Sequence, residues 1–141
     1  MAQAYPIIQI VVPELTFQAW CRFARSLISE DERRGGIVTV DNEQNYIVGL
    51  AAYRLEQDLR GGCSLLVDHF VAVDLIQREA VAQTLIAELE SLARRNHCSA
   101  VHTRLPGIGA SPSASWLVEL MRTHGHDVNQ LLLHKPIAKS A

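Results

Sequence analysis

The chain has 141 residues, of which 48% are hydrophobic and 20% are charged, with a formal net charge of −2. This composition is typical of a globular chain with an ordinary core, and we expect a single domain over residues 1–141. No broad basic surface is predicted, which argues against a nucleic-acid partner. No segment approaches the ~20 apolar residues of a membrane span and no basic leader precedes an apolar run, so we expect a cytoplasmic protein without a membrane partner.

The first half of the chain predicts a strand, a helix and an antiparallel meander. The β-branched run Ile7–Val12 is typical of a buried strand, and apolar residues then recur at helical spacing from Trp20 to Ile28. Short loops containing glycine or asparagine join the next three strands, as in consecutive hairpins. These strands are expected over Ile37–Val40, Tyr46–Leu55 and Ser64–Val73.

The second half predicts two helices, each followed by a strand. A helix from Gln77 to Arg95 has a continuous apolar face, and a second is expected between an N-cap at Ser113 and a C-cap at Gly125. The strands are expected over Ser99–Leu105 and Val128–His134. The order β-α-β-β-β-α-β-α-β predicts an α/β (α+β) fold, with a mixed, mostly antiparallel sheet flanked by helices.

The junction between the strand Ser64–Val73 and the helix that opens at Gln77 predicts an anion site. A helix begins with unpaired backbone N–H groups and a partial positive charge, so it attracts phosphate. The alanines at positions 80 and 82 are small enough to let an anion approach the backbone. The alternative is a plain strand-to-helix connection that uses small residues for close packing.

The element order and this junction resemble the GNAT superfamily of acyl-CoA-dependent N-acyltransferases, over roughly Ile7 to Ile137. The family's pyrophosphate loop has the pattern Gln/Arg-x-x-Gly-x-Gly/Ala, and Gln77-x-x-Ala80-x-Ala82 is similar to it with alanine in place of a glycine. The apolar strand end before it and the closing segment Leu131–Pro136 also resemble the family. The loop lacks the usual proline and is one residue shorter than common.

The resemblance implies a coenzyme A site. The diphosphate would lie on the backbone of the first helical turn, and the pantetheine arm would pair with the strand end as an added strand does. Acetyl-CoA is then the expected co-substrate, with no metal. The implied cofactor-binding residues are Val71, Ala72, Val73, Gln77, Arg78, Glu79, Ala80, Val81 and Ala82.

His69 is the candidate general base. An amine acceptor must lose a proton to attack, and an imidazole with a pKa near 6.5 suits that task. Strand alternation predicts that His69 shares a face with Val67, Val71 and Val73 and lies opposite Phe70. The resemblance places His69 where the family often carries a glutamate base. The alternative is a structural, hydrogen-bonded histidine.

The family's usual general acid is a tyrosine on the later helix, and Met121 occupies that position here. Methionine cannot protonate a leaving thiolate. Tyr46, Tyr53, His102 or water could substitute, and the sequence selects none of them. We expect direct attack rather than a covalent enzyme intermediate, since no cysteine has a matching histidine in a recognisable motif.

Other motifs favour plain structural roles. Gly107 and Gly109 follow a strand, but the third glycine of a dinucleotide fingerprint would fall on Pro112. His124 and His126 carry metal-type donors without a third fixed partner, and cations at a helix end explain them better. The three cysteines Cys21, Cys63 and Cys98 are scattered and contain no Cys-x-x-Cys pair, which predicts buried thiols.

Two functions are therefore compared. The first is an N-acetyltransferase that moves an acetyl group from acetyl-CoA to a primary amine on a small molecule or a peptide. The second is a GNAT-like module without turnover that binds acyl-CoA or a protein partner. The strand–helix junction and His69 favour the first function, and Met121 with the glycine-poor loop favours the second. A homodimer and the identity of the acceptor stay open.

Overall fold

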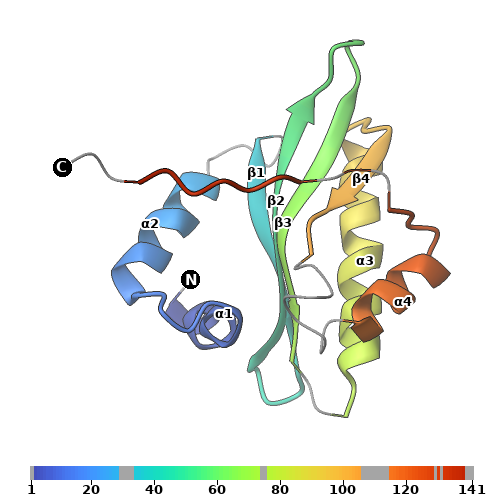
Figure 1. The fold of residues 1–141 in the computed structure, drawn as a ribbon. Helices are drawn as coiled ribbons and strands as arrows, with labels where there is room; N and C mark the ends of the chain where they lie inside the picture. Colours follow the sequence, from blue (N-terminus) through green and yellow to red (C-terminus); the bar gives the residue numbers. More distant parts are fainter. Residues whose placement is uncertain are drawn as a thin grey trace.

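The computed structural model describes residues 2–28, 34–73, 76–105, 115–128, 130 and 132–138. A sheet stands at the centre, with two N-terminal helices on one face and two later helices on the other (Figure 1). A 3₁₀ turn opens the chain at Ala2–Ala4. The elements that follow are α1 (Tyr5–Val11), α2 (Phe17–Leu27), β1 (Gly35–Asp41), β2 (Ile47–Gln57), β3 (Cys63–Ala72), α3 (Arg78–Arg95), β4 (Ala100–Thr103) and α4 (Ser115–Thr123).

The four strands lie in the order β1-β2-β3-β4, which confirms the mixed, mostly antiparallel sheet flanked by helices. β1, β2 and β3 pair antiparallel through two hairpins, whereas β4 pairs parallel to β3 after the helical crossover through α3. Asn45 and Gly61 take positive φ angles of 65° and 81° in the two hairpin turns. The meander predicted from the short glycine- and asparagine-containing loops is confirmed.

A β-bulge divides β3 into two halves. Ala52 of β2 pairs with His69, but the next residue, Tyr53, pairs with Val67, so Asp68 is an extra residue in β3. As a result Val67 and Phe70 both pack into the core beneath α3, whereas Val71 packs into the core beneath α1 and α2. The predicted common face of Val67 with Val71 is therefore wrong, because the extra residue resets the alternation of side chains.

α3 packs closely against the beginning of β2. A Cβ atom built on Gly49 would lie only 2.6 Å from Cγ1 of Val81, so a glycine is needed where the first turns of α3 meet the sheet. The buried face of α3 carries the residues predicted from its periodicity. They are Val81, Ala82, Leu85, Ile86, Leu89, Leu92 and Ala93.

The segment predicted as a strand over Ile7–Val12 is helical. Pro6 lies in the first turn of α1, where its missing N–H group costs nothing. Ala4, Ile7 and Ile8 are buried at helical spacing, while Ile10 is exposed. Packing of this apolar stripe on the sheet outweighs the β preference of the branched residues.

The predicted C-terminal strand over Val128–His134 is also not seen among its described residues. Residues 132–138 have no regular secondary structure and cross in front of the strands from the α4 side to the α2 side (Figure 1). The predicted C-cap is confirmed. Gly125 has a φ of 89°, and His126 donates its N–H to the Met121 carbonyl at 3.0 Å, the pattern of a Schellman motif. Ser113 lies outside the described residues.

Candidate functional site

The second half of β3 has an edge that β4 does not cover. The parallel ladder runs from Ser64 with Ala100 to Val67 with Thr103, followed by a bond from the Arg104 N–H to the Val67 carbonyl of 2.9 Å. β3 itself continues to Ala72. Within the described residues, the ladder therefore ends halfway along β3, where β4 itself ends.

The exposed edge offers backbone groups at two residues of β3. Val73 donates its N–H to the Val48 carbonyl of β2 at 3.0 Å, so its backbone faces β2. Because successive residues of a strand direct their backbone groups to opposite edges, Ala72 and Phe70 present theirs toward the side of β4. An extended ligand could add to β3 there as a further strand.

The N-terminus of α3 adjoins this edge in sequence. Gln77 is the N-cap residue, its side chain makes no capping hydrogen bond, and its carbonyl accepts the Val81 N–H at 2.9 Å. The N–H groups of Arg78, Glu79 and Ala80 precede that first helical bond and have no partner within the helix. They are the donors that a phosphate at this helix end could use.

The nine predicted cofactor-binding residues differ in how far they are exposed. Arg78, Glu79 and Ala80 are exposed. Val81 and Ala82 are buried in the core, and their N–H groups belong to the helical ladder. Ala80 lies within α3, where alanine is conformationally favourable, so the absent glycine does not strain the backbone at that position.

Arg78 is held at the start of α3 by an aromatic ring of α4. Its guanidinium carbon lies 4.5 Å from the centre of the Trp116 ring, a cation–π contact between the two helices. Trp116 is half-buried and packs against the core beneath α3. The stack leaves a positive charge beside the predicted anion site. The exposed Glu79 places a carboxylate in the same turn, which opposes anion binding.

His69 lies just past the bulge, on the face covered by α2. Its ring meets the Phe23 ring edge to face at 5.4 Å between centroids. Partial burial lowers the pKa of His69 below its usual value of 6.5; the nearby Asp68 carboxylate opposes this shift and Arg54 adds to it. The imidazole is therefore neutral at pH 7 and able to accept a proton.

Sequence analysis missed a charge network around the bulge. Asp68 accepts hydrogen bonds from Arg54 of β2, with Nε at 3.0 Å, and from Nη1 of Arg104 beyond β4 at 3.1 Å. A second guanidinium nitrogen of Arg54 completes a fork on the same carboxylate oxygen. The Asp68 side chain is only 15% exposed. The sequence places opposite charges on neighbouring strands, but which of them pair depends on the register that the bulge sets.

The position predicted for the general acid gives no proton donor. Met121 is buried in the core beneath α3, and so is Tyr53. Tyr46 is exposed beside the first hairpin turn. His102 lies on β4, opposite Leu66 in the ladder. Tyr53 and Met121 share one core cluster with Phe70 of the second half of β3.

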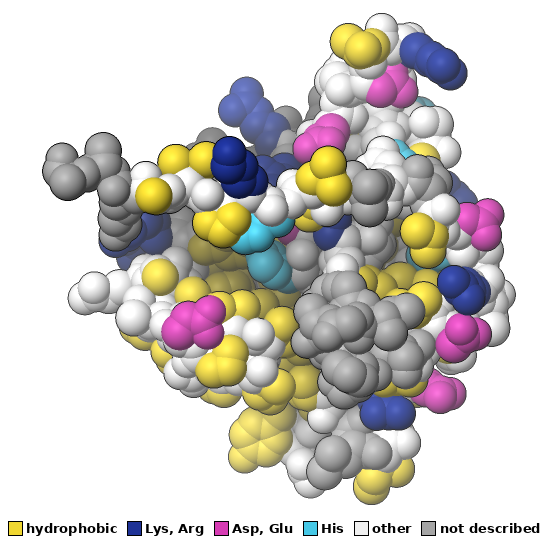
Figure 2. All heavy atoms as spheres, viewed as in Figure 1, with side chains coloured by type: hydrophobic (Ala, Val, Ile, Leu, Met, Phe, Trp, Pro, Cys, Tyr) yellow, Lys and Arg dark blue, Asp and Glu magenta, His cyan; other side chains and the backbone are white. Residues whose placement is uncertain are grey.

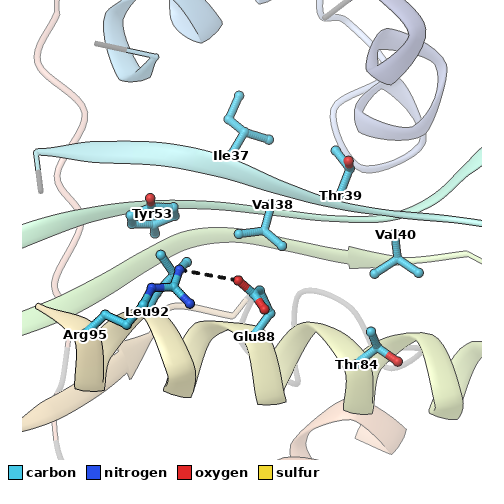
Figure 3. A pocket seen from close by; sticks show the side chains of 9 residues that line it. All are labelled: Ile37, Val38, Thr39, Val40, Tyr53, Thr84, Glu88, Leu92 and Arg95. Atoms are coloured by element: carbon cyan, nitrogen blue, oxygen red, sulfur yellow. Dashed lines mark ion pairs between the residues drawn. The ribbon is translucent and has the colours of Figure 1, made fainter. Parts of the chain in front are cut away.

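Two hollows lie away from the predicted cofactor residues. One, of about 430 Å³, lies between β1 and α3, where Val38 and Val40 point toward the helix and Glu88 pairs with Arg95 at 3.6 Å (Figure 3). The other, of about 1020 Å³, lies along β4, α4 and the segment after Gly125. None of the nine predicted residues lines either hollow.

Figure 2 shows all atoms from the same side as Figure 1, which is the face that residues 132–138 cross. Hydrophobic and histidine side chains gather in a hollow beneath that segment. Within the described ranges, no group of three or more histidine, cysteine or acidic side chains is arranged to hold a metal ion. No described helix has the length and apolar character needed to span a bilayer.

No protein-family model matches this sequence, and no curated protein matches it. Solved structures do. An aminoglycoside N-acetyltransferase in complex with CoA aligns with a TM-score of 0.76 and 11% identity, covering 96% of this chain and 88% of that chain. An aminoglycoside acetyltransferase from an uncultured soil metagenomic sample, in complex with sisomicin, aligns with a TM-score of 0.71 and 10% identity, covering 98% of this chain and 87% of that chain. Glucosamine-6-phosphate N-acetyltransferase from Arabidopsis thaliana aligns with a TM-score of 0.65 and 11% identity, covering 89% of this chain and 81% of that chain.

These similarities extend over nearly the whole chain at identities far too low for sequence recognition. The fold is that of the GNAT acetyltransferases, which confirms the structural side of the resemblance stated from the sequence. The bulged β3, the shortened ladder with β4 and the crossover helix α3 are the parts of that fold that form the candidate site.

Proposed function

We propose that this protein is an N-acetyltransferase that transfers an acetyl group from acetyl-CoA to a primary amine on a small molecule or a peptide. The observation that carries the proposal is the ladder between β3 and β4, which stops at Val67 while β3 runs on to Ala72. The open edge leads to the start of α3, so a strand-like arm and a phosphate site adjoin on one ligand path. The fold shared with acetyltransferases supports this assignment.

Coenzyme A would use three kinds of contact. The backbone of Phe70 and Ala72 would pair with the amides of the pantetheine arm. The N–H groups of Arg78, Glu79 and Ala80 would hold the diphosphate, with the Arg78 guanidinium beside it. Of the wider set predicted from the sequence, Val71, Val73, Gln77, Val81 and Ala82 would then shape the site through the strand end and the close packing of α3.

The proposed chemistry is direct attack of the amine on the thioester. The amine gives up a proton, its nitrogen forms a bond to the acetyl carbonyl carbon, and the bond between carbon and sulfur breaks. His69 is the proposed base, because its lowered pKa keeps the imidazole neutral and ready to take that proton. The departing thiolate of coenzyme A is stable enough to leave without a protein acid, which suits the buried Met121.

Thermal denaturation with coenzyme A tests the binding site. Ligand bound only to the native state raises the melting temperature by mass action. Ala80→Leu should abolish the shift by crowding the first turn of α3. Ala87→Leu is the matched control, since Ala87 is an exposed alanine two turns further along the same helix, and it should keep the shift. Equal shifts in both variants would contradict the proposed diphosphate site.

Release of free thiol from acetyl-CoA tests turnover. Aminoglycosides, amino sugars, polyamines and lysine peptides form a suitable acceptor panel, since glucosamine 6-phosphate and sisomicin, which are named with the similar structures, both carry primary amines. Amine-dependent thiol release supports the transferase. A coenzyme A shift without thiol release for any acceptor would favour the second function, a GNAT-like module that binds acyl-CoA or a protein partner without turnover.

A further inference from the structure

Two cysteines that are far apart in the sequence lie next to each other where β3 and β4 begin. The Sγ atoms of Cys63 and Cys98 lie 2.8 Å apart, close to the covalent S–S distance of about 2.05 Å. Cys63 is the first residue of β3, and Cys98 lies between α3 and β4. Neither thiol takes part in the proposed acetyl transfer.

The backbone holds both cysteines in place. The Ser99 N–H donates to the Cys63 carbonyl at 2.8 Å, which ties the residue after Cys98 directly to Cys63. At the end of α3, His97 takes a left-handed φ of 58° and the Cys98 N–H donates to the Ala93 carbonyl at 2.8 Å. This Schellman-type turn directs the chain from the helix back to β3.

We propose that Cys63 and Cys98 are a dithiol–disulfide site that reacts with small disulfides such as oxidised glutathione. The sulfurs need to move by less than about 1 Å to bond, and the backbone ties on both sides already set their separation. Cys21 provides the contrast, because it lies on α2, on the opposite face of the sheet from α3. The site is separate from the second half of β3 and does not depend on the proposed function.

The two thiols have different roles in this reaction. Partial burial, and after it the hydrogen bond with Cys63, raise the pKa of Cys98 to about 12, so Cys98 keeps its proton longer. The thiolate is the nucleophile in exchange, and we assign the first attack to Cys63 because Cys98 is the thiol that resists deprotonation. Its sulfur bonds to one glutathione sulfur and releases the other as thiolate. Cys98 then loses its proton, attacks the Cys63 sulfur and releases the second glutathione.

The product would close a covalent loop from Cys63 to Cys98 that contains all of β3 and α3. A cross-link over a loop of this length removes much of the freedom of the unfolded chain. For a chain of this size we expect the melting temperature to rise by about 10 °C on oxidation.

The test incubates the folded protein with oxidised glutathione and then counts thiols and measures intact mass. Wild type and Cys21→Ser should each lose two thiols, become lighter by two hydrogens and carry no glutathione. Cys98→Ser should instead keep one glutathione on Cys63, because the second exchange is blocked. The rise in melting temperature should appear in the first two proteins and be absent from Cys63→Ser.

Three results would overturn the site. Wild type could keep all three thiols at oxidant concentrations that modify Cys98→Ser. It could instead end as a stable glutathione adduct. Peptide mapping could also place the new link at Cys21. Each of these means that Cys63 and Cys98 do not close into an internal disulfide from the native fold.

Discussion

The two halves of β3 differ in how completely they are bonded. From Cys63 to Val67 the strand is paired with β2 on one edge and with β4 on the other over most of its length, and its core residues Leu65 and Val67 are fully buried. Beyond the bulge, the strand keeps β2 as its partner and loses β4 within the described residues. The first half is bonded on both edges, and the second half contains the backbone groups and the His69 side chain that we propose contact coenzyme A and the acceptor.

The difference shows how one strand can serve both needs. A ladder paired on both edges has no place for an added strand, whereas a strand unpaired on one edge is a template for one. The bulge lies between the two halves, and hydrogen bonds to Asp68 connect it to Arg54 of β2 and to Arg104, the residue that follows β4. Substitutions in the two halves should therefore affect different measurements.

The largest effect is expected for His69→Gln in the second half. Removing a general base lowers turnover by about 10²–10⁴-fold, while glutamine retains size and hydrogen bonding. Affinity for coenzyme A and the melting temperature should change little. The measurement is thiol release at saturating acetyl-CoA with an acceptor that the wild type uses. Full activity in His69→Gln would make the histidine structural and end the functional contrast between the two halves.

Leu65→Ala should show the opposite behaviour in the first half. Truncating a fully buried leucine leaves a cavity and lowers the free energy of unfolding by about 3 kcal/mol. Chemical denaturation measures this loss. Coenzyme A should still bind to the folded fraction with nearly unchanged affinity. Leu59→Ala, at the exposed tip of the second hairpin, is the control and should leave the unfolding free energy unchanged.

Asp68→Asn tests the bulge that separates the halves. Asparagine retains the shape but loses the charge that two arginines share, and we expect a loss of about 1 kcal/mol in unfolding free energy. The figure is small because the side chains of Arg54 and Arg104 are 50% and 49% exposed and therefore screened by solvent. A double-mutant cycle with Arg104→Ala isolates the pair. Strict additivity of the two substitutions would indicate that the ion pair contributes nothing.

The smallest effect concerns pH. Because the pKa of His69 is lowered in the folded state, the unfolded chain binds this proton first as pH falls. The contribution of His69 to stability is thus complete above about pH 6.5 and is lost as pH falls through the lowered pKa. Between about pH 7.5 and 5, His69→Gln should lose less unfolding free energy than wild type. Parallel pH profiles for the two proteins would contradict the lowered pKa.

Most of the fold could be predicted from local sequence patterns. The alternation and turn residues of the meander, the apolar face of α3 and the C-cap at Gly125 all express preferences that act within a few residues. The strand prediction for Ile7–Val12 was wrong. The β-branched residues suggest a strand, whereas Pro6 and the spacing of Ala4, Ile7 and Ile8 indicate a helix. The choice between strand and helix depends on the sheet surface that this segment covers, which the local sequence does not contain.

The candidate site was less predictable, because its main feature is the register in which β2 and β3 pair. No residue type around Asp68 marks a bulge, and without it the face of Val67 is assigned wrongly. The contact between Arg78 and Trp116 and the meeting of Cys63 with Cys98 join parts of the chain that only the crossover through α3 brings together. The helix start at α3 could be predicted, since it is a local feature, and the anion site proposed there stays a prediction.

The bulge also predicts how the chain tolerates a change in length. Asp68 is one residue inserted into an otherwise regular ladder, because Val67 pairs with Tyr53 and His69 with Ala52. Deleting Asp68 would leave every other side chain of β3 on its present face and yield a straighter, uninterrupted strand. Deleting Val67 instead would move the Asp68 carboxylate into the fully buried place that Val67 now fills. A single-residue deletion is therefore compatible with folding at Asp68 and incompatible at its neighbour.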